Sequence, residues 1–452
     1  MPTPYPACVT VQSSLNGIDQ RPRWQRNLRL YPWFYFFHDL QFWLPLWIVF
    51  AIDGVGLSWA EIGAIGPAFY VITSFGQAPA GAIADRFGRL RVMRASLVIY
   101  IAFILWFAFA GSFWEAAIAW ALWGLAMVTL TGTDSAFLHD SLQAMGRARD
   151  FERLAGRAFA VRSVAMVLAT FGGGILAGMI GTQLTVISGA IGTAIALLIT
   201  FGFREPPRQE AGHEAQTPSY LSLMKQTLQL AARTPTIRYS LIFSALLVAA
   251  LVPEFYLIQP FLDRHGIEVG WVFTALQAPA RIATVFAAGL AFWLAMRFGL
   301  VRTVASMPFW VVGVYVGIAL LDHLGAIGLF VLLGIARGAQ MPLMEGYLNR
   351  RIPSHLRATA LSLNHMGWAL IMLPFLPIFG RVVNDHPLPT VFLGLAAFYG
   401  PLLLIIMILW VRADRQEGGR LRIPPAVPAL LREVLWKPQQ RPASVPRPVD
   451  FD

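Results

Sequence analysis

Long apolar segments recur along the whole chain, and this feature constrains the fold more than any other. A helix needs about 20 mostly apolar residues to cross the hydrocarbon core of a membrane. Segments of this kind occur at residues 30–52, 60–83, 92–112, 115–140, 157–180, 183–203, 238–262, 270–296, 303–321, 325–348, 358–383 and 389–411. Only 13% of the 452 residues are charged, against roughly a quarter in soluble domains. We therefore predict an all-α membrane protein with twelve transmembrane helices.

The basic residues predict how these helices are oriented. Cytoplasmic loops of membrane proteins carry an excess of Lys and Arg. Most of the 35 Lys and Arg residues lie in the two terminal tails, in the central connection and in every second loop. This distribution places both termini in the cytoplasm and accounts for the net charge of +11. Because membrane topology explains the charge, we expect no binding of nucleic acid.

A long polar connection divides the chain into two sets of six predicted helices. The expected parts are a cytoplasmic N-terminal tail (1–28), a first six-helix bundle (29–203), a cytoplasmic central loop (204–237), a second six-helix bundle (238–412) and a disordered cytoplasmic tail (413–452). In the central loop, Leu221, Met224, Leu228 and Ala231 follow helical spacing. This spacing predicts a short helix that lies on the inner surface of the membrane.

The two sets of helices resemble each other at an offset of about 210 residues. Each match is weak alone, but four of them fall on corresponding elements: Asp85–Gly88 with Met296–Gly299, Gly56 with Gly266, Gly124 with Gly334, and Arg157–Ala158 with Arg357–Ala358. Such parallel repeats place a central pathway at their interface, with the substrate site near the middle of the membrane.

The loop after the second predicted helix carries a recognisable motif, GAIADRFGRLR at residues 81–91. It resembles the signature loop of the major facilitator superfamily, which reads Gly, three residues, Asp, a basic residue, any residue, Gly and two basic residues. Leu90 departs from this pattern, although Arg91 follows at once. The resemblance extends over about residues 28–412. It implies two pseudo-symmetric bundles in a monomer of the bacterial inner (plasma) membrane, which moves a small-molecule substrate by alternating access.

The resemblance also implies a latch at the inner face that holds the outward-open state. Gly residues in the motif permit close helix approach and a tight turn. Asp85 can lie against a helix N-terminus, and the arginines can pair with acids on neighbouring helices. We expect Asp140 to pair with Arg89 or Arg86; the simpler alternative is that the arginines only fix the topology. The predicted latch residues are Gly81, Asp85, Arg86, Gly88, Arg89, Arg91 and Asp140.

Ionisable residues inside the apolar segments concentrate in every third predicted helix. Such a residue costs about 2.5–3.5 kcal/mol at the membrane centre on insertion scales, so it normally faces protein or water. The family places the first, fourth, seventh and tenth helices around the central cavity. At 100° per residue, the polar residues of the first helix share one face. The candidates for substrate binding or proton coupling are Tyr35, His38, Asp39, Gln41, Asp134, Glu254, Arg281, Arg337 and Glu345.

Several of these candidates have two possible roles. Asp39 either carries a proton or forms a structural pair with a histidine or an arginine. Asp134 lies in the inner third of its helix, which favours a structural role. Arg281 and Arg337 are stronger binding candidates, because two buried cations need counter-anions. An acid such as Glu254 could be the counter-anion when no substrate is bound. An anionic substrate could then compete with this acid for the arginine.

Together these features predict a secondary transporter that is coupled to protons. Loss of solvent raises the pKa of a carboxyl group and a nearby cation lowers it again, so substrate and proton can influence each other. No GxxxxGK[ST] loop occurs, which argues against direct use of ATP. We expect no enzymatic activity, cofactor or metal; the single cysteine, Cys8, cannot form a thiolate cage. The partners are membrane lipid, protons and the solute.

The direction of transport is a separate question. An aromatic cavity with scattered acids suits amphipathic or cationic solutes, so we expect export of drugs or metabolites. One feature of the sequence departs from the exporters of the family: Leu168-Ala169 stands where those exporters carry a Gly-Pro pair. The alternatives are a proton-coupled uptake symporter and a transporter-like sensor or assembly protein without flux. Met296, which replaces the acid in the second copy of the loop, weakly favours the last.

Overall fold

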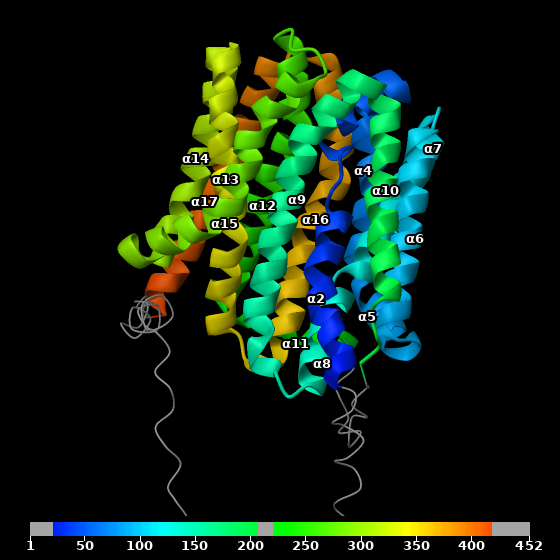
Figure 1. The fold of residues 1–452 in the computed structure, drawn as a ribbon. Helices are drawn as coiled ribbons and strands as arrows, with labels where there is room; N and C mark the ends of the chain where they lie inside the picture. Colours follow the sequence, from blue (N-terminus) through cyan, green and yellow to red (C-terminus); the bar gives the residue numbers. More distant parts are fainter. Residues whose placement is uncertain (1–20, 207–219, 418–452) are drawn as a thin grey trace, which may run out of the picture.

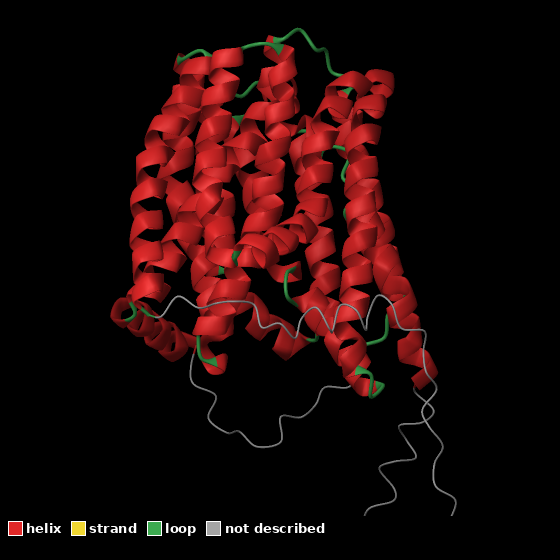
Figure 2. Cartoon of the chain, turned by 90° about the vertical axis from the view of Figure 1, so that its left-hand side faces the viewer, coloured by secondary structure: helices red, strands yellow, loops and turns green. Residues whose placement is uncertain are grey.

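The computed structural model describes residues 21–206 and 220–417, and the elements in these ranges are all helices (Figures 1 and 2). The long helices are α2 (Arg21–His38), α4 (Trp59–Phe75), α5 (Gln77–Phe87), α6 (Arg89–Ala108), α7 (Phe113–Leu130), α8 (Thr133–Ala144), α9 (Phe151–Ile180), α10 (Thr182–Phe201), α11 (Tyr220–Arg233), α12 (Pro235–Arg264), α13 (Trp271–Phe298), α14 (Leu300–Leu321), α15 (Ile327–Arg351), α16 (Arg357–Asp385) and α17 (Leu388–Gln416). The short ones are η1 (Leu44–Leu46), α3 (Trp47–Val49), η2 (Phe50–Gly54), η3 (Ala148–Asp150), η4 (Leu324–Ala326) and η5 (Ser354–Leu356). Helix α17 continues to Gln416, so the prediction of a disordered tail from residue 413 was wrong for 413–416. The rest of that tail beyond 417 and residues 1–20 lie outside the described ranges.

The apolar segments form membrane-length helices with bounds close to the predicted ones. Nine helices in the described residues are long and apolar enough to cross a membrane, or up to ten if the bent α13 is one span. Three predicted spans are interrupted: the first forms α2 with η1, α3 and η2, the second forms α4 with α5, and the fourth forms α7 with α8. The full count of twelve therefore stays a prediction.

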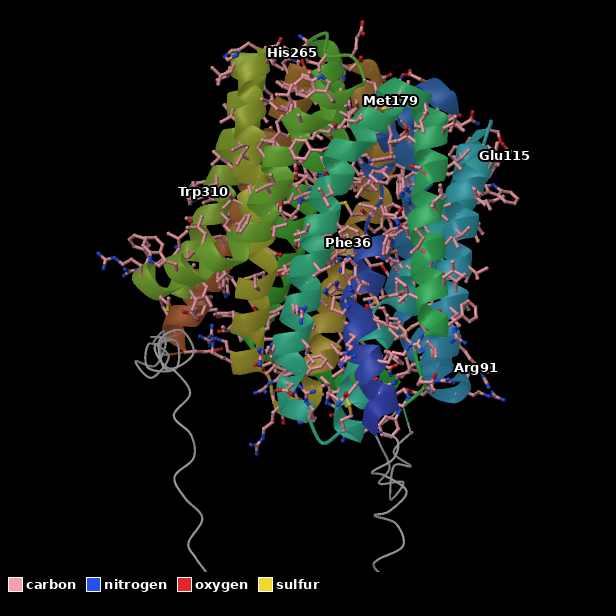
Figure 3. The ribbon with its side chains drawn as sticks, viewed as in Figure 1. Phe36, Arg91, Glu115, Met179, His265 and Trp310 are labelled. Carbon is pink, nitrogen blue, oxygen red and sulfur yellow. The ribbon has the colours of Figure 1, made fainter. Side chains whose placement is uncertain are left out.

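The first and last described helices, α2 and α17, serve here to name the two ends of the molecule. Helix α2 begins and α17 ends at the lower end in Figure 1, which we call the terminal face. Figure 3 places Arg91 toward this face, Phe36 near mid-height, and Met179 and His265 toward the other end, the opposite face. Helix α2 begins at Arg21, so the predicted N-terminal tail is partly helical.

Two glycines at the terminal face confirm the predicted alignment of the repeat locally. Gly88 separates α5 from α6 with φ 100° and ψ 139°. Gly299 separates α13 from α14 with φ 92° and ψ 142°. A positive φ is accessible to glycine at little cost. The two halves thus make the same turn at corresponding positions.

The buried apolar core joins the two halves except near the terminal face. One large cluster includes side chains from both halves, from Trp43 to Trp410. Toward the terminal face the core divides into one cluster from the first half, around Phe137, and one from the second half, around Leu348. The two halves are therefore packed together at the opposite face and separate toward the terminal face.

Small residues allow the close packing at the opposite face. A Cβ atom added to Gly63 of α4 would lie 2.3 Å from the carbonyl oxygen of Leu376 and 2.9 Å from the Cα of Gly380, both on α16. One added to Gly174 of α9 would lie 2.2 Å from the carbonyl oxygen of Gly270, just before α13. Backbones approach this closely only where side chains are absent. These two contacts close the opposite face.

Candidate functional site

The first predicted span is broken at its polar centre. Helix α2 ends at His38, and helical structure resumes only at η1. The Gln41 side chain occupies the break: its Nε2 donates to the backbone oxygen of His38 and, at 3.1 Å, to Thr193 Oγ1. Its Oε1 accepts from Trp43 Nε1 at 2.8 Å. The prediction of one continuous polar face was therefore wrong for Gln41, which stabilises the break.

The cause of the break lies in the local sequence. Pro45 has no backbone N–H and clashes with a preceding helical turn, so a continuous helix is costly there. The short polar side chain of Asp39 also offers the backbone alternatives to helical hydrogen bonds. Sequence periodicity misses this, because it assumes one unbroken helix.

Two glutamines of the second half bind the backbone at the break. Gln259 Oε1, on α12, accepts from the backbone N–H groups of Ile48 at 3.1 Å and Val49 at 3.3 Å. Gln277 Nε2, on α13, donates to the backbone oxygen of Pro45 at 3.1 Å. Both side chains are fully buried. The broken span is therefore tied to the second half of the molecule by hydrogen bonds.

Asp39 pairs with a histidine and an arginine, which was one of its two expected roles, but the identity of the arginine, Arg162, was not foreseen. Its Oδ2 lies 3.0 Å from Arg162 Nε, on α9, and 3.5 Å from His38 Nδ1. The Asp39 side chain is 11% exposed and that of Arg162 39%. The guanidinium carbon of Arg162 also lies 5.7 Å from the centroid of the Tyr35 ring. The signal was available: a single arginine interrupts the apolar run at 158–171.

Asp134 occupies a second break, between α7 and α8. Gly132 has a φ of 88° there, and Asp134 Oδ1 accepts from the backbone N–H groups of Gly132 at 3.1 Å and Ser135 at 2.6 Å. Asp134 Oδ2 accepts from the Tyr35 hydroxyl. Tyr31 donates to the Asp134 backbone oxygen at 3.2 Å. These contacts give Asp134 a structural role and join it to the Asp39 group through Tyr35.

The second half contains its own buried ion pair. Arg337 Nη2, on α15, lies 2.7 Å from Glu254 Oε2, on α12, and Arg337 Nε donates to the same oxygen at 3.0 Å. Arg281, on α13, lies over the ring of Phe255 at 5.6 Å. Glu254 and Arg337 are the charged groups that act on Arg281 electrostatically. This group therefore holds two cations and one anion.

A cavity of about 340 Å³ adjoins this ion pair. It is lined by Tyr70, Val248, Leu251, Val252, Phe255, Arg337, Gln340, Met341, Asn364, His365 and Trp368. Tyr70 comes from the first half and stacks edge-on against Trp368 of the second at 5.4 Å. Glu345, a candidate for substrate binding or proton coupling, does not line the cavity. The cavity thus combines aromatic walls with one guanidinium group.

The predicted latch contact is present at the terminal face. Arg89 Nη1, on α6, lies 3.0 Å from Asp140 Oδ2, on α8. The carboxylate at the N-terminus of α6, however, is Glu205 and not Asp85. Its two oxygens accept from the backbone N–H groups of Arg89 at 2.8 Å and Leu90 at 2.9 Å. Asp85 is exposed at the end of α5.

The other motif residues surround this contact. Gly81 lies within α5, Gly88 forms the turn, and Arg91 is exposed on α6. Arg86 lies over the ring of Phe87 at 5.6 Å. These positions are compatible with either a latch or a purely topological role.

The second half has an ion-pair group at the same face, although its motif is degenerate. Arg351, at the end of α15, pairs with Asp414 and, at 3.2 Å, with Glu417. Asp414 also accepts from the Tyr347 hydroxyl at 2.7 Å. Sequence reasoning missed this group because it searched only the loop that aligns with residues 81–91.

A sequence model of the Major Facilitator Superfamily matches residues 32–276, more than half of the chain. The chain belongs to the major facilitator superfamily. Members of this superfamily are transporters and not enzymes, and the chain accordingly has a multi-pass membrane transporter fold. A comparison with curated proteins gives no match.

Solved structures of superfamily transporters share the fold. A variant of the nucleoside transporter NupG is 16% identical with a TM-score of 0.74, and the match covers 85% of this chain and 99% of that one. A bacterial homolog of the human lysosomal transporter Spinster, inward-facing and unoccupied, is 17% identical with a TM-score of 0.63 over 87% and 95%. A D-xylose–proton symporter is 14% identical with a TM-score of 0.67 over 86% and 97%. At these identities the likeness concerns the fold alone.

Proposed function

We propose that the chain is a proton-coupled secondary transporter that moves a small organic solute by alternating access. The observation that carries this proposal is the Glu254–Arg337 ion pair beside a cavity with aromatic walls. The packing of the two halves supports it, because they are joined at the opposite face and separate toward the terminal face. This is one end state of an alternating-access cycle, with the cavity open toward the terminal face.

The ion pair supplies a physical means of coupling. Arg337 has only one carboxylate partner in the described residues, Glu254. A solute with an anionic group can take that place on the guanidinium, which offers several donors in a fixed plane. Glu254 would then be a buried carboxylate without its cation, a costly state that a proton relieves. Solute and proton therefore bind together.

The cavity also suggests the class of solute. Tyr70, Phe255 and Trp368 provide flat apolar surfaces, and Arg337 provides a cation. Gln340 lines the same space, but its Nε2 already donates to Ser244 Oγ at 2.8 Å. A planar organic anion fits these groups, since its ring packs on the aromatic walls while its charged group reaches the guanidinium.

The direction of transport follows from this coupling. Export in exchange for protons requires proton and solute to compete for one acid. Here the solute displaces Glu254 from Arg337, and Glu254 then takes up a proton, so solute and proton are bound at the same time. The geometry therefore favours uptake symport, which was the alternative at the level of sequence, over export. Asp39 is less suited to coupling, because neither Asp39 nor its partner Arg162 lines the aromatic cavity that Arg337 reaches. Its pair with Arg162 is proposed to be structural.

The remaining assignments follow from the family and the charge distribution. We propose that the terminal face is cytoplasmic, that the membrane is the bacterial inner membrane, and that the protein acts as a monomer. We propose that the Arg89–Asp140 contact, which joins two helices of the first half, is the local part of the latch.

Flux in proteoliposomes tests the function. The probes are labelled orotate, a planar anion; uridine, a planar neutral solute; and D-xylose, which has no ring system of this kind. An acidic exterior should drive accumulation of orotate at least tenfold above protein-free liposomes. Glu254→Gln should abolish the effect of the gradient, while Asp39→Asn should retain it.

Each other outcome has a definite reading. Accumulation driven by an acidic interior would establish antiport and overturn symport. Loss of coupling in Asp39→Asn but not in Glu254→Gln would assign the proton to Asp39. Absence of flux for all three probes in folded protein, with no binding either, would favour the sensor or assembly role.

A further inference from the structure

A wide basic groove lies at the terminal face of the second half, away from the proposed solute cavity. It has a volume of about 1250 Å³ and lies where α13 ends, α14 begins and α17 ends, at the lower left in Figure 1. Four arginines line it: Arg297, Arg302, Arg412 and Arg415. Much of the remaining wall is apolar and comes from Met296, Phe298, Phe309, Met407, Ile408 and Val411. The groove therefore combines positive charge with a hydrophobic surface.

No residue in the described part of the chain neutralises the positive charge of the groove. Within the described residues, none of the four arginines forms a hydrogen bond or an ion pair, and all four are exposed. Asp414 is the acid that lines the groove, and it already binds Arg351 and Tyr347. Four like charges around one space repel each other, which favours an anion between them.

The first half shows what the same position looks like when the protein supplies the anion. There the N-terminus of α6 follows Gly88 and is capped by the Glu205 carboxylate. The N-terminus of α14 follows Gly299 in the same conformation. No described side chain caps it, and it opens into the arginine groove. The second half thus repeats the architecture without the carboxylate.

The surroundings indicate that the anion comes from the membrane. Phe298 is 55% and Phe309 60% exposed, so an apolar surface runs from the groove up the side of the bundle. Arginines at the edge of the hydrocarbon region attract anionic headgroups of the adjacent leaflet. Guanidinium groups bind phosphate oxygens through paired hydrogen bonds. A free anion would use the arginines but would leave the apolar wall uncovered.

We propose that this groove binds an anionic phospholipid, with its phosphodiester among Arg297, Arg302, Arg412 and Arg415 and an acyl chain along the apolar wall. The bound lipid joins α14 to α17 at the terminal face. It takes the place that Glu205 occupies in the first half. The proposal does not depend on the solute or on the direction of transport.

Native mass spectrometry of the full-length protein in detergent tests the lipid site. The probes are phosphatidylglycerol and phosphatidylcholine with identical acyl chains, and inorganic phosphate alone. We expect phosphatidylglycerol to bind at least tenfold more tightly than phosphatidylcholine. The double variant Arg302→Gln/Arg412→Gln should lose this preference. The matched control, Arg149→Gln/Arg153→Gln, removes the same charge from exposed positions on the terminal face of the first half and should keep it within about twofold.

The same experiment can overturn the proposal in three ways. Equal losses in the two double variants would show a general charge effect without a site. Inorganic phosphate that competes with phosphatidylglycerol at equal concentration would identify a free-anion site. Tight lipid binding only in a chain that ends at residue 417 would show that the segment 418–452 occupies the groove. Unchanged thermal stability of the variants in detergent excludes misfolding as the cause of any loss.

Discussion

The ion pair between Asp39 and Arg162 offers a quantitative test of how the broken first span is held. Arg162→Met removes the charge while retaining most of the apolar stem, and Asp39→Asn removes the opposite charge. Each single variant leaves one charge without its main partner in a mostly buried setting. The double variant leaves neither.

The magnitude follows from the geometry. At the 3.0 Å separation of Arg162 Nε and Asp39 Oδ2, an effective dielectric of about 20 gives a gross attraction of about 5.5 kcal/mol. Breaking a fully buried pair costs about 3–5 kcal/mol, but Arg162 is 39% exposed, so water compensates part of the loss. We expect each single variant to lose about 2–3 kcal/mol of unfolding free energy.

The assay is a double-mutant cycle on the protein in mixed micelles. Unfolding with increasing sodium dodecyl sulfate is followed by the fluorescence of the 15 tryptophans. The double variant should be about as stable as either single variant, which corresponds to a coupling of about 2 kcal/mol. Arg153→Met, on the same helix but exposed, should change stability by less than about 0.5 kcal/mol.

A coupling below about 0.5 kcal/mol would refute this reasoning, because independent sites add within that margin. In that case the loss of unfolding free energy in the double variant would equal the sum of the losses in the two single variants. The Asp39–Arg162 ion pair would then make no measurable contribution to the free energy of unfolding.

Three further predictions concern other parts of the molecule. Gly63→Ala places a Cβ against the Leu376 carbonyl and should open the opposite face, so amide exchange at that end of α4 and α16 should rise at least threefold; unchanged exchange would contradict the closure described. Gln259→Leu leaves two buried N–H groups without an acceptor and should cost about 1–3 kcal/mol in the same unfolding assay, while a loss under 0.5 kcal/mol would show that the contact is dispensable. The hydrogen bond from Arg264 lowers the pKa of Asp322, so this pair stabilises the fold above the ordinary aspartate pKa of about 3.9 and the gain disappears as pH falls through the lowered value. Because both side chains are well exposed, the gain should stay below about 1 kcal/mol. Asp322→Asn should lower the free energy of unfolding by this amount at pH 7 and should leave it unchanged at a pH below the lowered pKa, where no gain remains.

Much of the fold is predictable from the sequence because hydrophobic length and basic loops are local signals. The predicted spans from 183–203 onward differ from the observed helices by only a few residues at most ends. The short helix at 220–233 lies where the spacing of Leu221 and Leu228 indicated one. The pairing of Arg89 with Asp140 also followed from the motif.

The sequence was least informative where side chains bind a distant backbone. Gln259 and Gln277 look like ordinary polar residues of apolar helices, and their partners are backbone groups about 200 residues away. Gln41 was placed on a helix face because a periodic pattern cannot indicate where a helix stops. Arg162 was not among the predicted site residues, since its partner Asp39 is adjacent only after folding.

Joint binding of solute and proton at the Glu254–Arg337 pair is the central step of the proposed transport cycle. The most direct measurement is the external pH of weakly buffered, well-coupled proteoliposomes when orotate is added without an imposed gradient. We expect the exterior to become more alkaline as orotate enters, with a fixed number of protons taken up per orotate, and Glu254→Gln to abolish the pH change. Acidification of the exterior, or orotate entry without proton movement in the parent protein, would contradict joint binding.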